Sequence, residues 1–110
     1  MSRINQLKTF LKDNPKNSFL LYALAKEYQG SGQFDEALRQ FQVLLEQDPN
    51  YVGAYYHLGK LYESMEQPSK AFFTYKKGME IADLVNDQHA KSELAGAKLN
   101  LGDDEDFEEV

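Results

Sequence analysis

Residues 18–51 read SFLLYALAKEYQGSGQFDEALRQFQVLLEQDPNY, and residues 52–85, VGAYYHLGKLYESMEQPSKAFFTYKKGMEIADLV, repeat their pattern without a gap. A fixed period of 34 residues indicates tandem copies of one supersecondary unit. Because each copy can bury its apolar face only against a neighbour, we expect a stacked array, and such arrays usually present binding surfaces. The identical pairs are Tyr22 and Tyr56, Leu24 and Leu58, Lys26 and Lys60, Tyr28 and Tyr62, Gln33 and Gln67, Ala37 and Ala71, and Glu46 and Glu80.

Each copy is predicted to contain two helices. In the first copy, the apolar residues of 21–28 recur at the i, i+3, i+4, i+7 spacing of one helical face, and Asn17 is suited to cap that helix. Two glycines at 30 and 32 then interrupt the pattern. A second amphipathic stretch covers residues 34–45 and ends at the Asp48-Pro49-Asn50 turn, so the first copy reads as helix, turn and helix.

The second copy follows the same plan with a few local changes. Its linker, residues 63–67, lacks glycine, but Pro68 is well suited to the first position of a helix. Asp83 stands where the first copy has Pro49, so the helix is free to continue to about Val85. The Asn86-Asp87 pair then supplies a turn and a cap for the next helix.

Single helices are predicted on both sides of the repeats. Residues 3–13 resemble a second helix without its partner, and residues 88–101 resemble a first helix without its partner. Lone flanking helices would cover the two end faces that any repeat array leaves open. We therefore predict an all-α single domain over residues 1–102, built from antiparallel helix-turn-helix repeats as an α-solenoid of about six helices. A simple three-helix or four-helix bundle is the structural alternative.

The repeats resemble the tetratricopeptide repeat (TPR) family. The resemblance is good over residues 18–85 and partial over 3–17 and 86–102. It departs from the family pattern at Leu44, Gly78, Glu66 and Asp83, where the family prefers alanine, alanine, glycine and proline. The matching positions are the pairs Leu24-Ala25 and Leu58-Gly59, the tyrosines Tyr28 and Tyr62, and Gly32, Ala37, Phe41 and Pro49.

The resemblance implies where a ligand would bind. In a TPR-type stack the first helix of each repeat lines a concave groove, and residues at a common spacing on these helices face it. We call these sets of residues the stripes: Phe19, Tyr22, Lys26 and Gln29 in repeat one, Gly53, Tyr56, Lys60 and Glu63 in repeat two, and His89, Ser92, Gly96 and Leu99 on the last helix. The tyrosine and the lysine of the first stripe recur in the second, although the apolar core face does not need them.

A tyrosine-plus-lysine ladder suits a peptide that carries apolar and acidic side chains. Tyrosine provides rigid contact area, and lysine contacts carboxylates or carbonyls. The plain alternative is that both lysines are ordinary solvated surface and both tyrosines cover the seam between helices. We therefore predict a non-catalytic module that binds a protein or peptide in the groove, with no cofactor. A second hypothesis is a homodimer through an apolar strip of Leu94, Leu99 and Leu101 on the uncovered last helix. A third is a groove without a dedicated ligand.

Charge is concentrated at the C-terminus. The chain holds 18 acidic and 12 basic residues, a net charge of −6. Six of the acidic residues lie in 103–110, where no basic residue occurs, so residues 1–102 are neutral overall. A neutral body with an acidic end is poorly suited to nucleic acid or anionic membranes. We predict that residues 103–110 form a solvated, disordered tail, with docking of the tail toward Lys26 and Lys60 as a less favoured alternative.

Other chemistry has little support in the sequence. There is no cysteine, and His57 and His89 have no recognisable acid and nucleophile beside them, so we predict neither an enzyme nor a metal site. No apolar run approaches the roughly 20 residues that span a bilayer, and residues 1–10 do not resemble a signal peptide. We accordingly expect a cytoplasmic protein.

Overall fold

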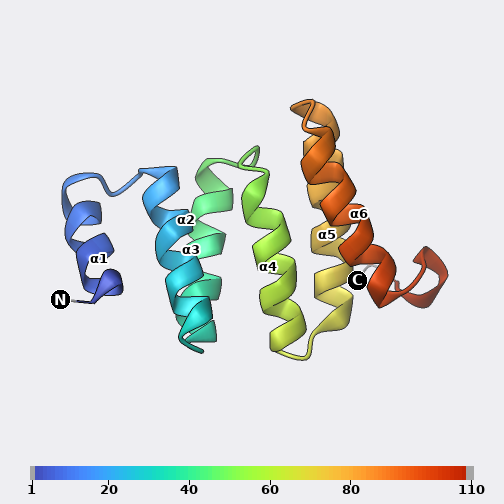
Figure 1. The fold of residues 1–110 in the computed structure, drawn as a ribbon, viewed down its shortest axis with the longest axis horizontal. Coiled ribbons are helices and arrows are strands. Elements are labelled where there is room, and N and C mark those ends of the chain that lie inside the picture. Colours follow the sequence, from blue (N-terminus) through green and yellow to red (C-terminus); the bar gives the residue numbers. More distant parts are fainter. Residues whose placement is uncertain (1, 109–110) are drawn as a thin grey trace. The chain divides into compact units, whose positions relative to one another are not determined.

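The computed structural model describes residues 2–108, and all regular structure in that part of the chain is helical (Figure 1). This confirms the predicted all-α fold with its six helices and locates a further short helix near the C-terminus. The helices are α1 (Arg3–Asp13), α2 (Ser18–Gly30), α3 (Phe34–Gln47), α4 (Gly53–Ser64), α5 (Pro68–Leu84), α6 (Gln88–Leu101) and the 3₁₀ helix η1 (Asp104–Asp106).

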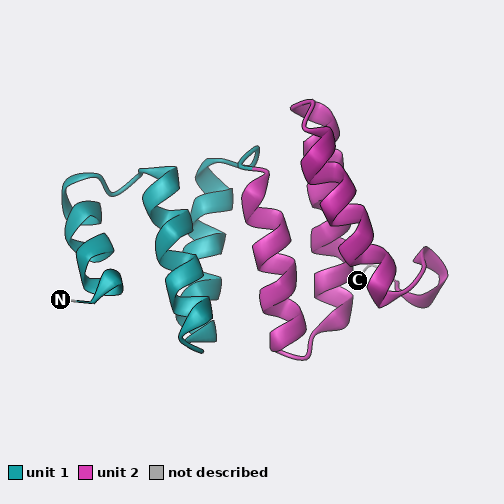
Figure 2. Cartoon of the chain, viewed as in Figure 1, with its two compact units in different colours: residues 1–51 teal, residues 52–110 magenta. Residues whose placement is uncertain are grey.

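The chain divides into two compact units at the boundary between the repeats (Figure 2). Unit 1 covers residues 1–51 and holds α1, α2 and α3, whereas unit 2 covers residues 52–110 and holds α4, α5, α6 and η1. Residues 1–102 were predicted as a single domain; each of the two compact units holds one repeat together with its flanking helix.

In unit 1, α2 packs against both α1 and α3. The Asn17 side chain accepts a hydrogen bond of 3.0 Å from the backbone N–H of Leu20, which is the N-cap that the sequence predicted. Gly32 takes a φ of 78° in the turn between α2 and α3, a conformation that glycine adopts without steric cost. The buried residues of the unit are Leu7, Leu21, Leu24, Ala25, Tyr28, Ala37, Phe41 and Leu44.

In unit 2, α5 packs against α4 and α6, and α4 also contacts α6. Pro68 begins α5 as predicted, and Asp87 caps α6 by accepting a bond of 3.0 Å from the N–H of Ala90. Glu66, at the position of Gly32 in repeat one, takes a φ of 59°. The turn geometry of repeat one is therefore kept in repeat two without its glycine.

Two glycines bring the helices of unit 2 close together. A Cβ atom on Gly59 would collide with the ring of Tyr75, so α4 and α5 approach each other more closely there than an alanine would allow. A Cβ atom on Gly78 would lie 2.6 Å from Cβ of Tyr55 and 3.0 Å from Cδ1 of Leu94. Gly78 thus lets α4, α5 and α6 meet at one point, where the family pattern prefers alanine.

The prediction of a continuous exposed apolar strip on the last helix is wrong, because only one of its three leucines is exposed. Leu94 is 1% exposed because it packs against α5 beside Gly78, and Leu101 is half-buried. Leu99 alone of the three is strongly exposed, at 69%. Although no further helix follows α6 to complete a repeat, its central residue Leu94 is buried because α6 packs against α5 and α4.

The acidic C-terminus was predicted to be a disordered tail, and the structure differs from this prediction. Residues 104–106 form η1, and the ring of Phe107 stacks on the ring of Phe72 in α5. Asp104 pairs with Lys76 and Lys98 and not with the lysine of the repeat-two stripe. Asp104 and Phe107 thus contact α5 and α6, while Glu109 and Val110 of the predicted tail lie outside the described residues.

Within residues 2–108, no helix combines the length and the apolar character needed to cross a bilayer.

Candidate protein-binding surface

The repeat-one stripe lies along α2 in unit 1. Phe19 is 61% exposed, one of the few large apolar side chains in the described chain that stands mainly in solvent. Lys26 is exposed, and its Nζ lies 5.2 Å from the centre of the Tyr22 ring. An ammonium over a tyrosine face makes a cation–π contact, so the lysine stem covers the ring and its charge stays at the surface.

A shallow hollow of about 160 Å³ lies on this stripe. Its walls combine the exposed Phe19 ring and the Tyr22–Lys26 pair with Glu27, which pairs with Arg3 of α1 at 3.3 Å. Within residues 2–108, Lys26 makes no ion pair. The hollow therefore offers aromatic surface beside a cation whose charge no carboxylate of the described chain neutralises.

The repeat-two stripe lies along α4 in unit 2 and repeats the same pair. Nζ of Lys60 lies 5.5 Å from the centre of the Tyr56 ring. Unlike Lys26, however, Lys60 pairs with a carboxylate of its own helix, Glu63, at 3.7 Å. Glu63 also accepts a hydrogen bond from the hydroxyl of Tyr75. Lys60 therefore has a carboxylate partner on its own helix, which Lys26 lacks among the described residues.

Burial and this hydrogen bond act together on Tyr75. Burial raises the pKa of Tyr75 above its ordinary value of 10.0, and the bond to the Glu63 carboxylate raises it further because the phenol must keep its proton to donate. In unit 1 the corresponding residue is Phe41, which has no hydroxyl, and Gln29 stands in place of Glu63. The arrangement is therefore specific to repeat two.

The two stripe tyrosines also pack against neighbouring rings. Tyr22 lies 5.2 Å from Tyr51, and Tyr56 lies 6.3 Å from Tyr75 and 5.5 Å from His57, measured between ring centres. Burial raises the pKa of Tyr51, with Tyr22 as a secondary cause. Each stripe tyrosine therefore has an aromatic neighbour inside its own unit.

The remaining stripe residues are more dispersed. Gly53 is the first residue of α4, and His89 and Ser92 are exposed on α6. The side chain of His89 is 87% exposed and pairs with Glu93 at 3.4 Å, one helical turn further on. His89 and Ser92 offer hydrophilic surface on α6, and the exposed Leu99 of the same stripe adds aliphatic rather than aromatic contact area.

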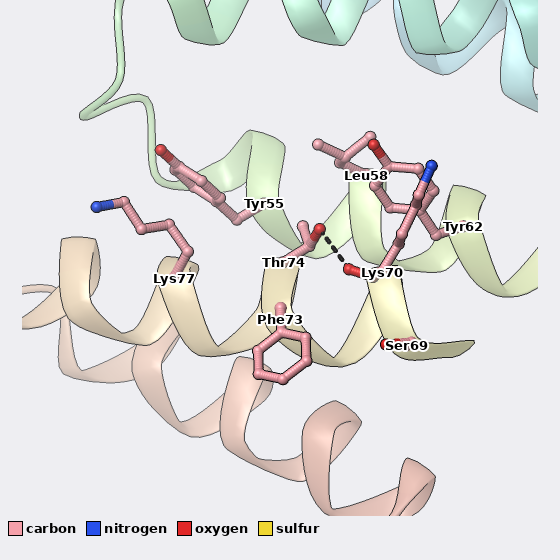
Figure 3. A pocket seen from close by; sticks show the side chains of 8 residues that line it. All are labelled: Tyr55, Leu58, Tyr62, Ser69, Lys70, Phe73, Thr74 and Lys77. Carbon is pink, nitrogen blue, oxygen red and sulfur yellow. Dashed lines mark hydrogen bonds between the residues drawn. The ribbon is translucent and has the colours of Figure 1, made fainter. Parts of the chain in front are cut away.

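The sequence did not indicate a larger pocket between α4 and α5 (Figure 3). Its volume is about 440 Å³, and Lys70 lies at one side with its Nζ 5.9 Å from the centre of the Tyr62 ring. The repeat places Tyr55, Leu58 and Tyr62 at the positions of Leu21, Leu24 and Tyr28 in the first copy, and no sequence signal marks a hollow beside them. The lining residues are Tyr55, Leu58, Tyr62, Ser69, Lys70, Phe73, Thr74 and Lys77.

No group of three or more histidine, cysteine, aspartate or glutamate side chains is placed to hold a metal ion in the part of the chain that the structure describes.

Comparisons with known proteins agree with this architecture. The sequence profile of the family described as TPR repeat matches residues 25–65, and that described as tetratricopeptide repeat matches residues 52–83. A TPR repeat-containing protein of Pseudomonas aeruginosa is 28% identical over 91 residues, which are 83% of this chain and 87% of that protein.

Solved structures extend the similarity. A tetratricopeptide repeat domain protein from Salinibacter ruber is 45% identical, with a TM-score of 0.75 over 79% of this chain and 88% of that one. A protein from Bordetella parapertussis is 28% identical, with a TM-score of 0.82 over 92% of this chain and 88% of that one. The repeat period, the helix pairs and these matches together show that the chain belongs to the tetratricopeptide repeat family.

Proposed function

We infer that this chain binds a segment of another protein through its stripe residues, and that this segment carries both acidic and apolar or aromatic side chains. TPR repeats form protein–protein interaction modules and are generally non-catalytic. The observation that carries the finer proposal is the hollow on α2, where the exposed Phe19 ring adjoins Lys26, a lysine without an ion pair in the described chain. A ligand carboxylate would neutralise this charge, and an apolar ligand side chain would cover the ring.

The two stripes are proposed to contribute unequally. Lys26 is available for a ligand carboxylate without first losing an ion pair, whereas a ligand at Lys60 competes with Glu63 at 3.7 Å. Because Glu63 also holds the hydroxyl of Tyr75, it is not free to move aside without breaking that bond. Repeat one is therefore the proposed site of charge recognition, and repeat two supplies mainly tyrosine surface.

Charge reversal in the intact chain tests this proposal. Partners captured from lysate by wild type would be compared with those captured by Lys26→Glu, Lys60→Glu and the control Lys12→Glu, an exposed lysine of α1 outside the stripes. The partner segment would then be made as a peptide for calorimetry. We expect the control to bind as wild type does, Lys26→Glu to bind about tenfold or more weakly, and Lys60→Glu to bind only slightly more weakly.

Helical circular dichroism and melting curves that match wild type would first show that all variants are folded. Equal capture and equal affinity for Lys26→Glu and wild type would overturn the assignment of the stripe. Self-association through α6, the alternative that we considered, is less well supported because Leu94 is buried and Leu99 stands out as a single exposed leucine on that helix.

A further inference from the structure

Residues 103–107, which we call the C-terminal clip, follow the end of α6 (Figure 1) and contact side chains of α5 and α6 in unit 2. The Phe107 ring stacks on the Phe72 ring with a centre-to-centre distance of 4.4 Å and an angle of 23° between the planes. Phe72 is itself completely buried. The clip therefore helps to cover an aromatic ring that α5 presents toward the end of the chain.

Charge complementarity holds the other end of the clip. The Oδ1 atom of Asp104 lies 3.4 Å from Nζ of Lys98 and 4.0 Å from Nζ of Lys76. Nζ of Lys98 also lies 4.7 Å from the centre of the Phe72 ring. One lysine thus joins the carboxylate contact to the aromatic contact, and the carboxylate and the ring that meet this surface stand three residues apart in the chain.

The turn that leads into the clip is specified by the sequence. Gly102 has a φ of 146°, and a Cβ atom there would lie 2.7 Å from Oδ2 of Asp106 and 3.3 Å from Cε2 of Phe107. The backbone N–H of Asp103 donates a hydrogen bond of 2.8 Å to the same carboxylate of Asp106. Glycine at 102 and aspartate at 106 therefore shape the segment that presents Asp104 and Phe107.

The clip is nevertheless held by few contacts. Asp104 remains 66% exposed at its side chain, and Phe107 is only half-buried. Exposed ion pairs contribute little and are screened by salt. Release of a segment attached by one ring and one carboxylate would break few contacts and would uncover the Phe72 ring beside two lysines.

We propose that the surface formed by Phe72, Lys76 and Lys98 is a second peptide-binding site, which takes a partner segment with an aspartate three residues before a phenylalanine. The clip is its intramolecular occupant and competes with the partner. The chemistry of the ligand follows from the occupant on the page: a stacked ring, and a carboxylate between two ammonium groups. None of the stripe residues takes part, so this inference is independent of the proposed function of the stripes.

The test uses the full chain and a peptide copied from residues 102–108, Gly-Asp-Asp-Glu-Asp-Phe-Glu. Backbone amide shifts would be followed by NMR as the peptide is added to wild type and to Phe107→Ala, which removes the ring of the clip. Because a tethered segment competes at an effective concentration on the order of 1 mM, we expect Phe107→Ala to bind the peptide about tenfold or more tightly than wild type. The shifts should occur on α5 and α6.

Three controls make the result specific. The peptide with alanine in place of phenylalanine should not bind, and adding Lys98→Glu to the Phe107→Ala chain should abolish binding. Gly102→Ala, which strains the turn and keeps the ring, should also increase binding of the added peptide. This second variant keeps the proposal open to refutation if Phe107→Ala proves poorly folded.

Two outcomes would overturn the proposal. The first is an absence of shifts on α5 and α6 in folded Phe107→Ala and Gly102→Ala chains at millimolar peptide, which would leave the clip as a packing element only. The second is equal binding of the phenylalanine and alanine peptides, which would reduce the interaction to nonspecific attraction between lysines and acids.

Discussion

The two repeats of this chain have the same helices but differ at three linked positions. Repeat one has alanine, phenylalanine and glutamine at 25, 41 and 29, and repeat two has glycine, tyrosine and glutamate at 59, 75 and 63. Tyrosine needs room for its ring and an acceptor for its hydroxyl, and Gly59 and Glu63 supply them. A change in the helix contact is therefore coupled to a change in surface charge.

The coupling explains why identical lysines have different surroundings. Lys26 and Lys60 lie over their tyrosines in nearly the same way, at 5.2 Å and 5.5 Å. The glutamate that serves the buried hydroxyl in repeat two is also within 3.7 Å of Lys60. Sequence identity at a surface position thus does not guarantee equal availability to a ligand, because neighbouring core residues decide which charges stand beside it.

Among substitutions that test this difference between the repeats, Gly59→Ala is expected to lower the unfolding free energy most. Its new Cβ would collide with the Tyr75 ring, so we expect the variant to lose on the order of 2 kcal/mol of unfolding free energy, despite the better helix propensity of alanine. The matched change in repeat one, Ala25→Gly, should lose about 1 kcal/mol through propensity. Urea unfolding monitored by circular dichroism measures both.

A double variant sharpens this prediction. Gly59→Ala/Tyr75→Phe copies the pair found in repeat one and frees the ring from Glu63, so it should be more stable than the sum of the two single changes implies. Strict additivity would show that the glycine and the tyrosine hydroxyl are not linked.

The second largest effect is expected from Tyr75→Phe, which removes the buried hydroxyl but keeps the ring. Loss of the bond to Glu63 should cost about 1 kcal/mol at neutral pH. The folded-state pKa of Tyr75 lies above the ordinary value of 10.0, so its contribution to stability is complete below pH 10 and decreases as the pH rises further.

The slope of that decrease identifies the residue. Above pH 10, one such tyrosine lowers the unfolding free energy by about 1.4 kcal/mol per pH unit, until the folded protein ionises as well. Wild type should therefore lose stability more steeply than Tyr75→Phe between pH 10 and the start of alkaline unfolding. Burial also raises the pKa of Tyr51 and Tyr62, so the variant should keep a smaller slope. Parallel curves would contradict the role assigned to the hydroxyl.

The smallest effect is expected from Gln29→Glu, which copies the acidic position of repeat two next to Lys26. An exposed pair three residues apart on a helix contributes about 0.5 kcal/mol or less, so thermal stability should hardly change. The slight gain should vanish at high salt because the two charges are then screened. A change above about 1 kcal/mol that persists at high salt would show that Gln29 has a structural role beyond surface charge.

Much of the fold was predictable because the spacing of apolar residues and the capping residues along the chain indicate where each helix begins and ends. The period of the apolar residues placed the helices, Asn17 and Asp87 were recognisable as caps, and Pro68 as a helix start. The stripe residues were predicted from the repeat identities and the family resemblance, and their role in binding stays a proposal. The pocket between α4 and α5 had no sequence signal, because a hollow depends on how side chains from two helices fill the space between them.

The sequence alone determined the period, the number of helices and the family, because each of these follows from spacing along the chain and from residues that neighbour one another in it. Only the tertiary structure decided which charges and rings meet. Glu63 and Tyr75 come from different helices, and Asp104 and Phe107 meet side chains of α5 and α6 through a turn at Gly102. The composition of residues 103–108 favours disorder, but the Phe107 ring has a matching partner in Phe72, and burial of this aromatic surface offsets part of the conformational entropy lost when the segment is ordered, while the carboxylates stay in water.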